Sequence, residues 1–186
     1  FITAFATTLG PGVLSAYLFA QRITDAVVQI ISQSITTASL PTLSLEYEEN
    51  RISEHERLVY KYVKILFFSA VIISIAIFFL RDFVVELLYG NNPANELIVI
   101  FLIGFLILLP FSMISSYLVI GFYSMKNTGK VFFGNLIATV SMIAICYYFK
   151  DSGIYSLIYG IVSYYVISNL IYLFLYSRKK IRKAHV

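Results

Sequence analysis

Two charged residues, Arg22 and Asp25, lie well inside the mostly apolar stretch Val13–Leu40. An arginine guanidinium is permanently charged, and its planar set of N–H donors matches the oxygen atoms of a phosphate group. An aspartate three residues later on a helix lies close to the arginine, where it can orient or neutralise it. The pair therefore predicts non-covalent binding of an anionic group rather than a reaction at either side chain.

Further polar residues in this stretch recur at steps of three, four and seven residues, which is the spacing of one helical face. Together with Arg22 and Asp25 they are Ser15, Gln29, Gln33 and Thr36. As a helix the stretch would be about 42 Å long, which exceeds the roughly 30 Å of a bilayer core. Because charge is costly against lipid, the polar face must meet protein or water. We predict that this helix forms the wall of a polar cavity, with the substrate-binding residues Arg22, Asp25, Gln29 and Gln33.

A simpler interpretation stays open. Arg22 and Asp25 can neutralise each other and serve only to pack a helix bundle. The polar stripe continues for two turns beyond the pair, and this favours the cavity.

The composition is that of a membrane protein. Hydrophobic residues make up 59% of the sequence and charged residues only 13%, compared with roughly 25% charge in a soluble domain. The mean hydropathy is +0.82. We therefore expect an all-α fold, a polytopic transmembrane helix bundle that forms a single membrane domain over residues 1–186.

The sequence lacks the residue clusters that are typical of enzymes and metalloproteins. It contains no GxSxG, HExxH, glycine-rich phosphate loop or paired-cysteine motif. His55 and His185 are far apart and Cys146 is the only cysteine, which argues against a zinc site. We predict a protein that is not an enzyme, without catalytic residues, metal or cofactor. The basic residues lie at the ends of apolar spans, so that nucleic acid is not an expected partner.

Five full spans are expected after the end of a preceding one, which closes at the Gly10–Gly12 turn. They cover residues 13–40, 59–80, 97–122, 131–149 and 154–176. Because the chain begins with an apolar segment and Phe1, we expect it to be a segment of a longer polytopic protein.

Several local features also carry expectations. The first span should stop near Pro41, and the charged residues 46–57 should form a solvated loop or a short interfacial helix. Residues 82–90 (DFVVELLYG) are amphipathic enough to lie along the membrane interface. Pro110 should kink its span, either as packing geometry or as a hinge. Ser156 and Gly160 form a small-xxx-small pair suited to close helix contact.

The distribution of basic residues predicts the orientation. Only Arg81 and Lys150 lie between spans on one side of the membrane. The opposite side carries the other extramembrane basic residues, namely Arg51, Arg57, Lys61, Lys64, Lys126, Lys130, Arg178, Lys179, Lys180, Arg182 and Lys183. The positive-inside rule then places the C-terminus in the cytoplasm and the Gly10–Gly12 turn outside, in a multi-pass protein of the bacterial inner membrane.

The run LSAYLFAQRITDAVVQIISQSITTASLPTLS resembles the eighth transmembrane helix of MurJ-type lipid II flippases, within the multidrug/oligosaccharidyl-lipid/polysaccharide exporter superfamily. A second similarity is the segment Gly121–Ser124 followed by Asn127 and Thr128, which resembles a turn of that family. In order, the resemblance covers nearly the whole chain, from the end of span seven through span twelve. Gln21, the missing proline after Asp25, and Gly129–Lys130 depart from the family pattern and leave the cargo open.

The resemblance implies the C-terminal lobe of a flippase that moves an undecaprenyl-pyrophosphate-linked peptidoglycan precursor (lipid II) by alternating access. Its partners would be this lipid-linked cargo, membrane lipids and a missing N-terminal lobe of the same protein. The family's cavity arginine falls on Arg22, and Asp25 lies at the position of its acidic or amide neighbour. Two alternatives remain: a polysaccharide-unit or drug exporter of the same superfamily, and a membrane scaffold that no longer transports.

Overall fold

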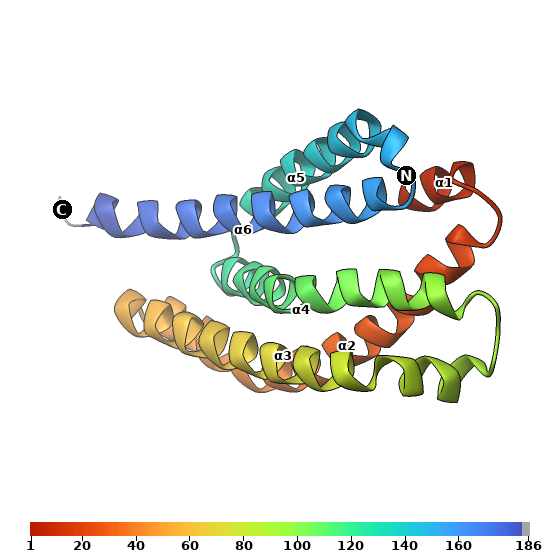
Figure 1. Ribbon diagram of the computed structural model, residues 1–186. Helices are drawn as coiled ribbons and strands as arrows, with labels where there is room; N and C mark the ends of the chain where they lie inside the picture. The colour runs from red at the N-terminus through yellow and green to blue at the C-terminus, as the bar shows by residue number, and fades with distance from the viewer. Residues whose placement is uncertain (184–186) are drawn as a thin grey trace.

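The computed structural model describes the backbone of residues 1–183 and the side chains of residues 1–176. The regular secondary structure of this part is entirely helical (Figure 1). The elements are α1 (Ile2–Thr8), α2 (Val13–Glu48), α3 (Ile52–Tyr89), α4 (Asn95–Ser124), α5 (Thr128–Tyr148), the short 3-10 helix η1 (Lys150–Ser152) and α6 (Tyr155–Lys183). Among the described residues, α3, α4, α5 and α6 are long and apolar enough to cross a membrane. The predicted all-α polytopic bundle is therefore confirmed.

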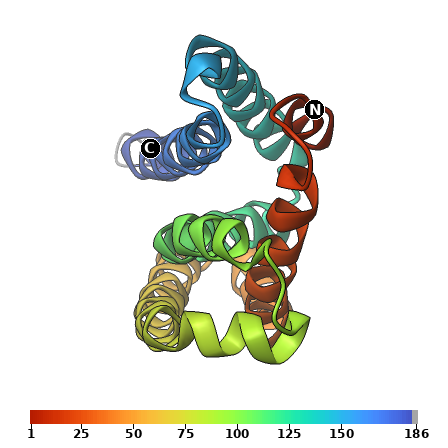
Figure 2. The ribbon, with the colours of Figure 1, turned by 45° about the vertical axis from the view of Figure 1, so that its right-hand side comes forward.

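Helix α4 lies at the centre of the bundle and packs against α2, α3 and α6. Helices α5 and α6 form an antiparallel hairpin that stands apart from α2 and α3 in Figure 2. The buried side chains form two clusters. The first, which includes Tyr17 and Phe101, joins α1, α2, α4 and the α5–α6 hairpin. The second, which includes Tyr117 and Tyr172, joins the other ends of α2, α3, α4 and α6.

The turn at Gly10–Gly12 forms as predicted. Gly10 and Gly12 have φ values of 136° and 80°, and Gly12 is the N-cap of α2. These backbone conformations are costly for residues with a Cβ atom. The glycines therefore allow the short α1 to fold back beside α2.

Helix α2 does not stop near Pro41, and this prediction was wrong. The helix continues through Pro41 to Glu48. Two contacts hold the part around the proline, since Leu43 is completely buried and the Tyr117 hydroxyl donates to Ser39 Oγ at 2.7 Å. Packing against α4 therefore outweighs the loss of one backbone hydrogen bond.

The charged residues 46–57 form neither the expected solvated loop nor a separate short helix, because they are divided between the end of α2 and the start of α3. Only residues 49–51 lie between α2 and α3, with Asn50 at a positive φ of 58°. The Arg51 guanidinium donates to both carboxylate oxygens of Glu46, at 2.6 and 3.0 Å. The charged side chains of this segment thus stabilise a tight turn between two long helices.

Residues 82–89 are not a separate interfacial segment but the last turns of α3. Figure 2 shows that this yellow-green end of α3 turns away from the preceding part of the helix and runs across the end of the bundle. Gly90 ends the helix with a φ of 70°. The amphipathic pattern was real, but it belongs to a continuous helix.

The α5–α6 hairpin depends on small residues at its contact. A Cβ atom added at Gly160 would collide with Cys146 Sγ and would lie 3.3 Å from the carbonyl oxygen of Met142. Ser156, one turn earlier, is fully buried. The prediction of close helix contact at Ser156 and Gly160 is confirmed.

Pro110 lies inside α4, which stays a single helix across it. A proline cannot donate to the carbonyl group four residues earlier, which here belongs to Leu106. The Ser74 hydroxyl of α3 donates to that oxygen at 2.8 Å. A neighbouring helix therefore supplies the hydrogen bond that the proline removes, as membrane helices require.

We expect Ser74→Ala to lower the free energy of unfolding of the full-length protein in detergent by about 1 kcal/mol. In a Pro110→Ala background the new backbone N–H can reach Leu106, so the same serine change should cost close to nothing. Ser69→Ala is the matched control, because the Ser69 hydroxyl donates to Ile65 of its own helix at 2.8 Å. An equal cost of Ser74→Ala in both backgrounds would show that the two groups are not coupled.

Candidate functional site

The four predicted binding residues lie on one face of α2. The side chains of Arg22, Asp25, Gln29 and Gln33 are all exposed in this chain. Their stripe is extended by Ser15, Ser34 and Thr37 and is interrupted by Ile30, which is 72% exposed. The periodicity that predicted a common face is therefore confirmed for α2.

The exposed faces of the other long helices have a different character. On α3 the outward side chains include Phe68, Ile72 and Phe79, which are 63%, 67% and 78% exposed. On α5 they include Phe132 and Val140. Such faces suit the hydrocarbon of a membrane, whereas the α2 stripe would leave charged and amide groups without hydrogen-bond partners there. The α2 stripe is therefore the face of this bundle that is adapted to water or to a polar partner.

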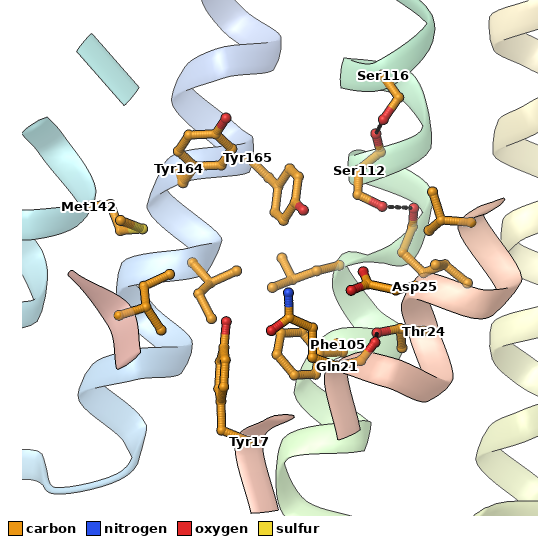
Figure 3. Close-up of a pocket in the computed structure, with 15 residues that line it drawn as sticks. Tyr17, Gln21, Thr24, Asp25, Phe105, Ser112, Ser116, Met142, Tyr164 and Tyr165 are labelled. Atoms are coloured by element: carbon orange, nitrogen blue, oxygen red, sulfur yellow. Dashed lines mark hydrogen bonds between the residues drawn. The ribbon is translucent and has the colours of Figure 1, made fainter. Parts of the chain in front are cut away.

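Beside the stripe, a cavity of about 280 Å³ opens between α1, α2, α4 and the α5–α6 hairpin (Figure 3). Asp25 is the predicted site residue that lines it, whereas Arg22, Gln29 and Gln33 lie outside its lining. Figure 3 shows the side chains of Gln21 and Asp25 pointing into the cavity from α2. Aromatic and hydroxyl side chains form much of the remaining wall, namely Tyr17, Thr24, Phe105, Ser112, Ser116, Tyr164 and Tyr165.

Most of these lining residues were not identified as candidates from the sequence. Gln21 and Val28 precede and follow Asp25 at helical spacing and share its face, which the pattern of α2 contains. Ser112 and Ser116 are four residues apart and share a face of α4, but they lie in a strongly apolar helix in which two serines do not indicate a site. No local pattern indicates that Tyr164 and Tyr165 of α6 approach α2, because that contact depends on the packing of helices far apart in sequence.

The three hydroxyl groups that line the cavity on α2 and α4 donate their protons to backbone oxygens. Thr24 Oγ1 donates to the Gln21 carbonyl at 2.9 Å, Ser112 Oγ to Leu109 at 2.8 Å, and Ser116 Oγ to Ser112 at 2.9 Å. A hydroxyl oxygen that has donated its proton keeps its lone pairs as acceptors. No Lys, Arg or His is among the residues that line the cavity. These oxygens and the Asp25 carboxylate are acceptors, and the Gln21 amide and the hydroxyl groups of Tyr17 and Tyr165 add donors to the same wall.

Arg22 lies on a different edge of α2 from the cavity. It follows Phe19 by three residues, and the Phe19 ring packs against Tyr89 of α3 with ring centroids 4.5 Å apart. The Tyr89 hydroxyl donates to the Phe19 carbonyl at 3.0 Å. Both Arg22 and Asp25 are described by the structure, and no ion pair joins them. The geometry therefore does not support the interpretation that the two residues only neutralise each other.

The family model described as Lipid II flippase MurJ matches residues 1–185. The chain belongs to the MurJ family. No curated protein and no solved structure matches the chain. Membership of the MurJ family confirms the resemblance seen in the sequence and makes the chain an integral membrane protein of a family that transports a lipid in peptidoglycan biosynthesis. The MurJ family is one of flippases rather than enzymes.

The MurJ family assignment agrees with the chemistry of the described residues. They contain no group of three or more His, Cys, Asp or Glu side chains that could hold a metal ion. A flippase moves its cargo without making or breaking covalent bonds. Its site therefore needs polar groups that bind the cargo reversibly. The α2 stripe and the adjoining cavity provide such groups.

We expect Arg22→Gln and Asp25→Asn to have additive effects on the unfolding free energy of the full-length protein, with a coupling below about 0.5 kcal/mol. The reason is that Asp25 faces the cavity and Arg22 does not. A buried neutralising pair would instead leave a costly uncompensated charge of about 3–5 kcal/mol when either partner is removed. A double-mutant cycle measures the coupling, and the Arg51–Glu46 pair at the α2–α3 turn is the positive control.

Proposed function

We propose that this chain is the C-terminal lobe of an inner-membrane flippase that moves lipid II outward by alternating access. The observation that supports this most strongly is the exposed polar stripe of α2 in a bundle whose other outer faces are apolar. The stripe would face a water-filled central cavity, and an N-terminal lobe of the same protein would form the opposite wall.

Arg22 is the proposed site for the pyrophosphate of the cargo. Its side chain is exposed and makes no ion pair with Asp25, so its donors remain available to phosphate oxygens. Gln29 and Gln33, two and three turns further along the same face, would offer hydrogen bonds to sugar or peptide groups. Because arginine stays charged at any physiological pH, this binding does not depend on a proton.

The proposed orientation has the C-terminus in the cytoplasm. The α2–α3 turn, the α4–α5 turn and the C-terminal end of α6 lie toward the same end of the bundle (Figure 1). Lys126 Nζ of the α4–α5 turn pairs with Glu48 Oε1 at the end of α2, at 3.0 Å. The basic side chains of residues 178–183 lie outside the described side chains. The proposed orientation therefore rests on the unequal distribution of basic residues in the sequence.

Rescue of cells depleted of their own lipid II flippase tests the role of Arg22. The full-length protein should restore growth, and Arg22→Gln should reduce the flipping rate at least about tenfold, which corresponds to roughly 1.4 kcal/mol of lost binding to the transported state. Arg22→Lys should retain part of the activity, because a lysine keeps the charge but not the planar donor fork. Arg57→Gln is the control, since Arg57 is exposed and pairs with Glu54 one turn away.

Two results would contradict the proposal. Full rescue by Arg22→Gln would favour a scaffold that does not use the arginine for transport. Failure of the unmodified protein to rescue, together with rescue of a strain that lacks a polysaccharide-unit exporter, would assign it a different lipid-linked cargo.

A further inference from the structure

The cavity next to Asp25 has the chemistry of a site for a positively charged amine. We propose that it binds an alkylammonium group, either the amine of a peptide on the cargo or a free organic cation. This inference rests on the proposed function where the amine belongs to the cargo. It gives Asp25 a role of its own, distinct from that of a counter-ion for Arg22.

The first argument is charge. Asp25 is the only acidic side chain among the lining residues, which include no Lys, Arg or His. Its carboxylate points into the space that Tyr17 and Tyr165 also face (Figure 3). A bound phosphate or carboxylate would be repelled by this carboxylate, whereas an ammonium group would be attracted.

The second argument is the match of donors to acceptors. A primary ammonium group has three N–H donors and no acceptor. The hydroxyl oxygens of Thr24, Ser112 and Ser116 have already donated their protons to backbone carbonyls. They therefore present acceptors to the cavity together with the Asp25 carboxylate. The three N–H donors of an ammonium group can be satisfied by these oxygens, and the negative charge of Asp25 favours an ammonium group over an anion.

The third argument is the aromatic content of the wall. The rings of Tyr17, Phe105, Tyr164 and Tyr165 line the cavity. Tyr17 and Phe105 pack edge to face, with ring centroids 5.4 Å apart. Aromatic faces attract ammonium groups by about 0.5–2 kcal/mol, and aromatic cages are a known way to bind alkylated amines. A carboxylate within such a cage selects for positive charge over an apolar group of equal size.

The size of the cavity indicates that it holds part of a ligand. Its volume of about 280 Å³ lies just below the roughly 300–1,000 Å³ of cavities that enclose a whole small molecule. An aminoalkyl chain fits this description, with the rest of the molecule lying along the exposed stripe of α2. A cargo with a phosphate and an amine would then contact Arg22 and Asp25 through opposite charges.

The test uses the full-length protein in detergent and two small probes, n-butylammonium chloride and 1-butanol, which differ mainly in charge. Saturation-transfer NMR on the probes measures their dissociation constants. We expect n-butylammonium to bind at least about tenfold more tightly than 1-butanol, and Asp25→Asn to remove that difference. Asp25→Glu should keep it, and Asp151→Asn, which changes an exposed acid at η1, should leave it unchanged. Equal binding of the two probes, or a preference that survives Asp25→Asn, would overturn the proposal.

Competition by cargo distinguishes the two sources of the amine. Cargo whose peptide amine is free should displace n-butylammonium, and the same cargo with that amine acetylated should not. If neither form displaces the probe, the site takes a free organic cation. If the unmodified protein binds both probes equally but still rescues flippase-depleted cells, the amine site alone is refuted. Probe selectivity without rescue would refute only the proposed lipid II transport.

Discussion

The organisation of this bundle depends on one constraint, namely that the polar face of α2 cannot lie against hydrocarbon. An arginine, an aspartate and two glutamines along a single stripe would each lose hydrogen bonds to water if lipid covered them. The opposite face of α2 packs on α4 through small and apolar residues, so that Ala16 and Ala20 are completely buried. Helix α2 is thereby held in one rotation, with its polar groups turned out of the bundle and its apolar groups turned in.

Buried polar side chains at two other places in the bundle are hydrogen-bonded to neighbouring helices, and this contrast makes the stripe informative. Ser115 of α4 donates to Asn169 Oδ1 of α6 at 2.9 Å, and Asn169 Nδ2 donates to the Phe111 carbonyl at 3.0 Å. At the other end, buried His55 lies 2.8 Å from Ser124 Oγ and 3.3 Å from the Tyr176 hydroxyl. Because Ser124 donates to the Gly121 carbonyl at 2.9 Å, it accepts from His55 Nε2. These contacts join the helices, whereas no described residue of another helix makes such a contact with Arg22, Asp25, Gln29 or Gln33.

Much of the architecture could be predicted from the sequence, because long apolar runs bounded by glycine and charge leave few alternatives. Each of the five predicted spans corresponds to one of the helices α2 to α6, although among the described residues only α3 to α6 are apolar enough to count as candidate membrane spans. The polar face of α2 followed from spacing alone. The end of α2 could not be predicted, since Pro41 weakens a helix locally but Leu43 and Ser39 are held by α4. The sequence also could not show that Asp25 lines the cavity while Arg22 lies outside it. The cavity wall is completed by tyrosines of α6 that lie about 140 residues further along the chain.

The most direct test of the central claim is the environment of the α2 stripe in a membrane. A nitroxide label at Gln33→Cys in a Cys146→Ser background of the full-length protein can be compared with one at Ile72→Cys on the exposed apolar face of α3. Electron paramagnetic resonance measures how often each label collides with a water-soluble nickel complex and with oxygen dissolved in lipid. We expect the nickel complex to dominate at residue 33 and oxygen at residue 72. Equal, oxygen-dominated collisions at both positions would show that α2 faces lipid and would contradict a polar cavity along this helix.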